Sequence, residues 1–124
     1  IQLSVEARSS PLFNFLPQHP VVFQWHGDTF SVLPENAKRI AENFACKHQA
    51  FIYKKRVFGF QYHMENTSLI IKGLVENCGG EMVPDVYVQT PNELLAHPEY
   101  IEQNNQWMNM FLTQLQEMVR KGDL

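Results

Sequence analysis

Short apolar runs separated by polar turns occupy the first half of the chain and predict a β-sheet there. Residues 1–7 alternate apolar and polar side chains, which is typical of a half-buried strand. Residues 21–25 form a second apolar run that ends in a polar cluster. Two more runs, 49–53 and 57–61, flank the basic residues 54–56 and predict a β-hairpin. The aromatic residues expected in the core are Phe13, Phe15, Phe23, Trp25, Phe51 and Phe60.

Helical periodicity dominates the second half. Asn66 or Thr67 can cap a helix over residues 68–77, and two glycines follow its end. Residues 90–96 begin with a capping-box pattern and have Pro at the first helical position. A longer amphipathic helix is predicted over residues 98–120. The side chains expected to be buried are Leu69, Ile70, Leu74 and Val75 in the first helix, and Trp107, Met108, Phe111, Leu112, Leu115 and Met118 in the last.

The composition fits one domain, or part of one, of ordinary globular character. The chain has 124 residues, of which 44% are hydrophobic, enough for one modest core. A net charge of −3 without a basic stripe argues against nucleic acid as a partner, and the apolar runs are too short to span a membrane. Two cysteines without zinc-site spacing indicate reduced thiols in a cytoplasmic protein, and we expect no metal or cofactor. Because the chain opens in the middle of a predicted strand and without Met, we expect it to be a piece of a longer protein.

The candidate chemistry lies where an apolar run ends. Residues 57–61 are followed by His63, with Glu65 two residues later. Open α/β sheets place their chemistry just beyond the carboxyl ends of strands. A histidine there, with a carboxylate close enough to orient its ring, supplies two members of a nucleophile–base–orienter triad. Taken alone, a histidine in this place is more often a strand-end residue satisfied by hydrogen bonds than a catalytic one.

Three motifs in register carry a family resemblance. They are WHGDTF at residues 25–30, ACKHQAF at 45–51 and GFQYHME at 59–65. In this order and spacing they resemble the C-terminal half of class I glutamine amidotransferase domains, with the stand-alone, GMP-synthase-like branch the most similar. The resemblance implies an α/β fold, in which residues 1–124 form the C-terminal portion of a doubly wound, flavodoxin-like domain. It also implies that residues 37–44 are extended, although their apolar residues fall at helical spacing; we favour the extended form because tertiary context overrides propensity.

The resemblance implies a mechanism and roles for particular residues. In that family a cysteine thiolate attacks the side-chain amide of glutamine, and ammonia passes to a synthase domain or subunit. His63 matches the catalytic histidine and Glu65 the carboxylate that orients it. Gly27 and Asp28 match a loop beside the glutamine substrate. The implied function is glutamine amide hydrolysis that delivers ammonia to an acceptor.

The sequence departs from the family pattern at the nucleophile. The family places that cysteine in Gly-x-Cys-x-Gly between a strand and a helix, and neither Cys46 nor Cys78 has this context. Met64 stands where the family usually has proline, which is expected to loosen the backbone between His63 and Glu65. The chain is therefore expected to be inactive alone and, with the rest of its sheet missing, to self-associate through exposed edges.

Two other functions remain open. A non-catalytic binding or regulatory protein on the same fold would have an incomplete triad by nature. A hydrolase acting on other γ-glutamyl bonds would use the same triad. The residues upstream of Ile1 distinguish the enzyme from the non-catalytic protein, because only the enzyme requires the nucleophile there.

Overall fold

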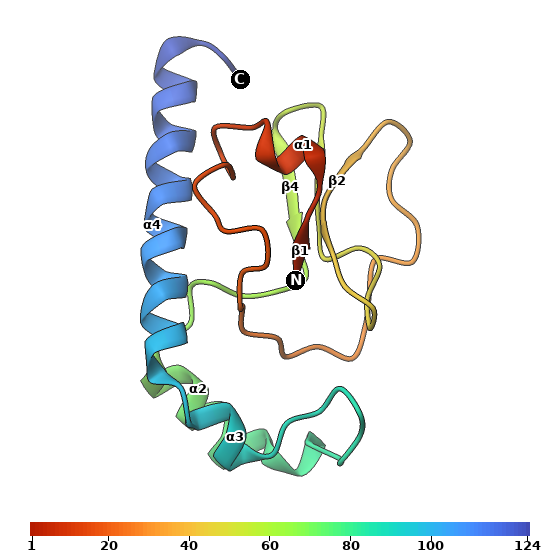
Figure 1. Ribbon diagram of the computed structural model, residues 1–124, viewed down its shortest axis with the longest axis vertical. Coiled ribbons are helices and arrows are strands. Elements are labelled where there is room, and N and C mark those ends of the chain that lie inside the picture. The colour runs from red at the N-terminus through yellow and green to blue at the C-terminus, as the bar shows by residue number, and fades with distance from the viewer.

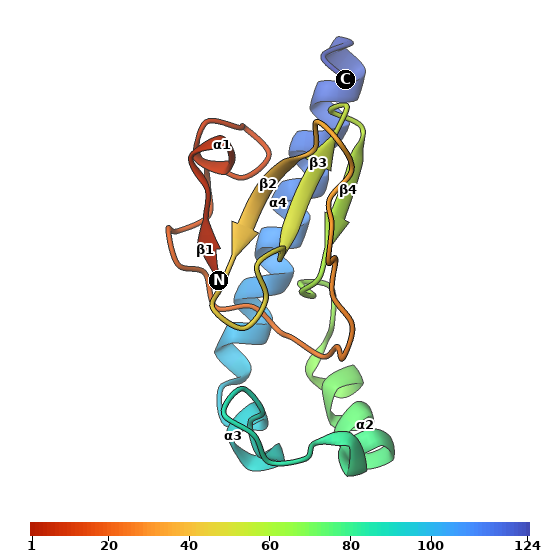
Figure 2. The ribbon, with the colours of Figure 1, turned by 90° about the vertical axis from the view of Figure 1, so that its right-hand side faces the viewer.

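A four-stranded antiparallel sheet forms one layer of the molecule. The computed structural model describes all residues, Ile1–Leu124. The strands are β1 (Gln2–Leu3), β2 (Lys38–Glu42), β3 (Ala50–Tyr53) and β4 (Val57–Phe60), and they lie side by side in that order. All three pairings are antiparallel (Figure 2). The α/β class is confirmed, and of the residues 37–44 expected to be extended, Lys38–Glu42 form β2.

The predicted hairpin is confirmed as β3 and β4. Its register pairs Tyr53 with Val57 at the turn and Phe51 with Gly59 farther along. In the connecting turn, Lys54 and Lys55 have φ values of 49° and 61°, which is the left-handed region that hairpin turns use. The hairpin therefore anchors the chain just before the candidate chemistry.

Two predicted strands are shorter than expected. Residues 1–7 form a strand only at β1, because Ser4 then caps the short helix α1 (Val5–Arg8) by accepting a hydrogen bond from the Ala7 N–H at 3.2 Å. Residues 21–25 are not a strand; only Phe23 pairs, through one isolated bridge to His63. An apolar run becomes a strand only where a neighbouring strand provides a series of backbone hydrogen-bond partners. This run lies beside an irregular segment, which provides one.

The predicted helices are confirmed, and α2 and α3 begin at their predicted capping residues. They are α2 (Ser68–Cys78), α3 (Pro91–Leu95) and α4 (Pro98–Lys121), with a short 3₁₀ turn η1 (Gly79–Glu81) after α2. Thr67 caps α2, and Thr90 and Glu93 form the full capping box of α3. α2 and α3 lie together beyond one end of the sheet (Figure 1).

The buried faces of the helices correct part of the prediction. In α2 the buried side chain is Ile71, whereas Leu69 is 81% exposed and Ile70 is also exposed. In α4, Phe111 is buried and Leu112 is exposed. α2 therefore buries one position rather than a broad stripe, so apolar residues alone could not identify its inner face.

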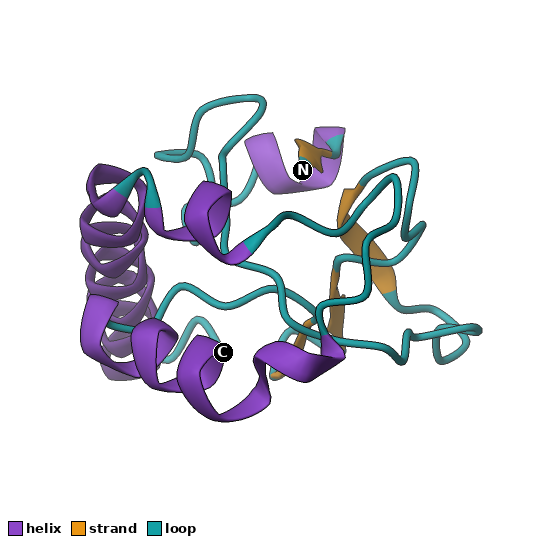
Figure 3. Ribbon diagram, turned by 90° about the horizontal axis from the view of Figure 1, so that it is seen from below, coloured by secondary structure: helices purple, strands orange, loops and turns teal.

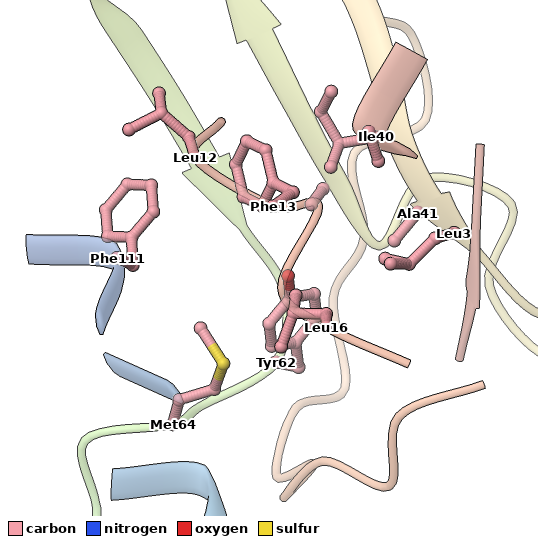
Figure 4. Packing of buried hydrophobic residues seen from close by; sticks show 11 residues of the cluster. Leu3, Leu12, Phe13, Leu16, Ile40, Ala41, Tyr62, Met64 and Phe111 are labelled. Atoms are coloured by element: carbon pink, nitrogen blue, oxygen red, sulfur yellow. The ribbon is translucent and has the colours of Figure 1, made fainter. Parts of the chain in front are cut away.

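The core fills the space between the sheet and α4 (Figures 1 and 4). Phe111 of α4 contacts Phe13, Phe58 and Phe60, with ring centroids 5.5 to 5.6 Å apart. Of the six aromatic residues expected in the core, Phe13 and Phe23 are buried and the others are half-buried.

No helix of the chain is both long and apolar enough to cross a membrane. Figure 3, viewed from the end where α2 and α3 lie, shows loop segments between α4 and the strands.

Candidate functional site

His63 and Glu65 are in direct contact just beyond β4. The Nδ1 atom of His63 lies 2.7 Å from Oε1 of Glu65. The backbone N–H of His63 donates to the carbonyl of Phe23 at 2.8 Å, which fixes the start of the turn. An ionised carboxylate accepts a hydrogen bond from Nδ1–H, so the neutral ring keeps its Nε2 lone pair free to act as a base. The two residues therefore have the relative geometry of a base and its orienter.

The second carboxylate oxygen of Glu65 is also satisfied. Oε2 accepts the backbone N–H of Met64 at 2.9 Å. Burial by itself would raise the pKa of Glu65, but the hydrogen bonds from His63 and from the backbone hold this pKa below its usual range. Glu65 is therefore ionised at neutral pH. A proline at position 64 would have no N–H to give, so Met64 supplies the carboxylate with a hydrogen bond that proline could not.

Met64 also anchors the turn. Its side chain is 2% exposed and belongs to the hydrophobic core (Figure 4). The loosening expected from the absence of proline is thus opposed by burial of the side chain and by the hydrogen bond to Glu65.

A cavity of about 280 Å³ borders the pair. Its walls combine apolar side chains with those of His63 and Glu65. Tyr62 lies in this wall with its hydroxyl buried and without a hydrogen-bond partner, and burial raises the pKa of Tyr62. The lining residues are Phe60, Tyr62, His63, Met64, Glu65 and Met108.

Gly27 and Asp28 line a different and larger cavity of about 1030 Å³. Neither His63 nor Glu65 is among its lining residues. The loop is held by His26, whose Nδ1 lies 2.8 Å from the carbonyl of Asp28 and whose Nε2 lies 2.9 Å from Oε1 of Gln24. Phe23 connects the two regions, because it lines the larger cavity and bonds to His63. The structure thus brings His63 and Glu65 together, whereas the expected substrate loop lines a neighbouring cavity.

Neither cysteine has the surroundings of a nucleophile. Cys46 is buried, with its Sγ atom 2.8 Å from Oγ1 of Thr29 and 3.7 Å from the carbonyl of His48. Cys78 is the last residue of α2. Neither lines the cavity beside His63. No group of three or more histidine, cysteine or carboxylate side chains is placed to hold a metal ion.

A second His-x-Glu pair shows that the hydrogen bond alone does not identify a functional site. His97 and Glu99, at the start of α4, also place Nδ1 and Oε1 2.7 Å apart. Their side chains are 54% and 62% exposed, somewhat more than the 37% and 54% of His63 and Glu65, and neither residue lines either cavity. The spacing by itself therefore produces this hydrogen bond, and the surroundings of His63 distinguish it from His97.

Sequence reasoning missed two asparagines of α4 that contact the site. Asn105 donates to the carbonyls of Met64 and Asn66, and Asn104 donates to the carbonyl of Val21. The available signal was their position, because asparagine is unfavourable inside a helix and two in a row need a reason.

Comparison with known proteins decides the family. The family described as glutamine amidotransferase class-I matches residues 1–75. The chain belongs to this family. A glutamine-hydrolyzing GMP synthase of Phocaeicola vulgatus is 34% identical over 86 residues, which are 64% of this chain and 17% of that protein.

Two solved structures share the fold of this chain over part of their length. The crystal structure of SMU.1228c has a TM-score of 0.80 at 24% identity and covers 93% of this chain and 49% of its own. A glutamine amido transferase from Methylobacillus flagellatus has a TM-score of 0.65 at 26% identity and covers 73% of this chain and 39% of its own. The chain thus spans at most about half the length of these relatives.

Proposed function

We propose that this chain carries the base and the orienting carboxylate of a glutamine amidotransferase, and that a cysteine outside the chain supplies the nucleophile. The observation that supports this is the 2.7 Å contact between His63 and Glu65 in a motif of the family, beside a cavity. Residues 1–124 would then be the C-terminal portion of one amidotransferase domain.

The proposed reaction uses the free Nε2 atom of His63. It accepts the thiol proton as sulfur attacks the amide carbon of glutamine. When the carbon–nitrogen bond breaks, His63 returns the proton to the leaving nitrogen and ammonia departs. Water then attacks the γ-glutamyl thioester and gives a proton to His63. The carbon–sulfur bond breaks, glutamate leaves, and His63 returns the proton to the cysteine sulfur. Glu65 holds the ring in one tautomer and stabilises the imidazolium in each half-reaction.

The remaining roles follow from the same proposal. Gly27 and Asp28 would border the glutamine from the larger cavity. The ammonia would pass to a synthase domain or subunit, in keeping with the match to a GMP synthase of which this chain covers 17%. The chain alone would be inactive, because it has a base and no activated thiol.

One observation favours a second candidate, a non-catalytic binding or regulatory protein on this fold. Neither Cys46 nor Cys78 is placed to react at His63. A hydrolase of other γ-glutamyl bonds would share the triad and differ only in its substrate.

The deciding experiment is the intact mass of the protein from its natural source, with and without a diazo-ketone glutamine analogue that alkylates the catalytic thiol. We expect a mass well above 14.5 kDa that shifts by one adduct. His63→Gln should slow the labelling strongly, whereas His97→Gln, in the matched exposed pair, should not. A protein that takes up no adduct would support the non-catalytic candidate, and hydrolysis of γ-glutamyl peptides in preference to glutamine would support the hydrolase.

A further inference from the structure

One side chain of helix α4, that of Asn105, holds the turn that contains Glu65. The amide nitrogen of Asn105 donates to the carbonyl of Met64 at 2.9 Å and to that of Asn66 at 3.0 Å. These carbonyls lie immediately before and after Glu65 in the chain. Both N–H groups of the amide are thus used, and the backbone on either side of the carboxylate is tied to the same helix.

The turn has little else to fix its backbone. Residues 64–66 belong to no helix or strand and make no backbone–backbone hydrogen bond. The only bond from their N–H groups is the one from Met64 to the Glu65 carboxylate. Asn105 and the buried side chain of Met64 are therefore the main restraints on where the carboxylate points.

The neighbouring asparagine holds the other side of the site. Asn104 is 3% exposed, and its amide nitrogen donates to the carbonyl of Val21 at 2.8 Å. Its Oδ1 accepts the N–H of Phe23 at 3.4 Å. The carbonyl of Phe23 accepts a hydrogen bond from the N–H of His63. Asn104 therefore anchors the segment to which the backbone of His63 is bonded.

We propose that Asn104 and Asn105 are positioning residues that set the ring of His63 against the carboxylate of Glu65. Their role in catalysis rests on the proposed function, whereas their effect on the geometry of the pair does not. Successive helical residues point about 100° apart, so one pair of asparagines can reach two different segments. Asn104 also donates to the carbonyl of Tyr100, just after Glu99, at 2.6 Å, but that bond stays within α4 and does not tie the His97–Glu99 pair to another segment.

The test is the ¹⁵N spectrum of the histidine rings in the 124-residue chain and in Asn105→Ala. In the original chain we expect neutral His63 to carry its proton on Nδ1, facing Glu65. In Asn105→Ala we expect a mixture of both tautomers, because the carboxylate is no longer held in place. The exposed Asn109, one turn along α4, gives the matched control Asn109→Ala, which should leave His63 unchanged. His97 serves as the internal reference in every spectrum.

The possible results separate positioning from a merely structural role. A folded Asn105→Ala protein in which His63 keeps its Nδ1–H tautomer would overturn the proposal. Equal changes at His63 and His97 would overturn it as well, because they would reflect a general loss of structure. If Asn105→Ala does not fold, Asn105→Ser retains one donor and is judged by the same criteria.

Activity provides the second readout, in the complete amidotransferase. Losing a residue that orients a catalytic group typically costs about 10-fold to 100-fold. We expect Asn105→Ala to lower kcat by about that factor with little change in KM, and Asn109→Ala to change neither. An inactive parent protein would contradict the proposed function and leave the NMR result standing. An active parent with an unaffected Asn105→Ala variant would contradict the positioning role alone.

Discussion

Replacing Gly59 with alanine should destabilise the protein, although the usual cost of glycine inside a strand predicts the opposite. Glycine inside a strand usually costs about 0.5–1 kcal/mol relative to alanine, so Gly59→Ala would be stabilising on that basis. The structure reverses the sign of the expected change in the free energy of unfolding. A Cβ atom at Gly59 would lie 2.1, 2.6 and 2.8 Å from three carbons of the Phe51 ring on the paired strand, closer than Cβ atoms and carbons approach in proteins.

The size of the effect depends on whether the Phe51 ring can move. Its retreat is restricted by Phe30, which packs edge-on against it with ring centroids 5.2 Å apart. Forcing an extra methyl group into a packed region typically costs about 1–3 kcal/mol. After the gain in backbone entropy, a net loss of about 0.5–2 kcal/mol is expected for Gly59→Ala.

Urea unfolding followed by circular dichroism measures this free energy directly. Phe51→Ala removes the ring that causes the clash, so Gly59→Ala in that background should be neutral or stabilising, with a coupling of about 1–3 kcal/mol between the two sites. Gly73→Ala is the control, because it lies in α2 with no atom within 4 Å of the new Cβ and should stabilise the helix by about 0.8–1 kcal/mol. A stabilised Gly59→Ala protein, or an equal cost with and without the Phe51 ring, would refute the reasoning.

Two further predictions concern the candidate site and the state of the chain. The pKa of Glu65 is held below its ordinary value of 4.5, so its ionised form stabilises the fold above that pH, and the contribution is lost as the pH falls through the lowered value. Glu65→Gln should therefore be less stable than the original chain at pH 7, and urea midpoints of the two should converge on acidification below 4.5; a gap that stays constant with pH would contradict this. The chain should also self-associate, because β4 is paired on one side only and side chains such as Phe44 and Leu69 are 103% and 81% exposed. Light scattering should give a mass above 14.5 kDa, and a monodisperse monomer would count against the view that part of the sheet is missing.

The elements with local signals were predictable from sequence. The capping box of Thr90 and Glu93 places the start of α3, and Thr67 places the start of α2. The hairpin follows from two apolar runs joined by three basic residues. In each case the signal and the hydrogen bond it predicts lie within a few residues of each other, so no knowledge of the rest of the fold is needed.

Elements that depend on a distant partner were not predictable. Residues 21–25 have the composition of a strand, but their neighbour is the irregular turn at His63, so only Phe23 pairs. Likewise, Ile71 rather than Leu69 or Ile70 is buried in α2, because the direction of its inner face is set by segments elsewhere in the chain. Periodicity shows that a face exists, and only tertiary packing selects it.

The site combines both kinds of information. The spacing of His63 and Glu65 was enough to predict their contact, yet His97 and Glu99 make the same contact on an exposed helix start. What differs lies elsewhere in the chain. The His63 pair borders a cavity, and its turn is tied to α4 by Asn105, 40 residues after Glu65. A pair of helical asparagines is therefore a useful signal to combine with a His-x-Glu motif, because it identifies the pair whose geometry the fold restrains from both sides.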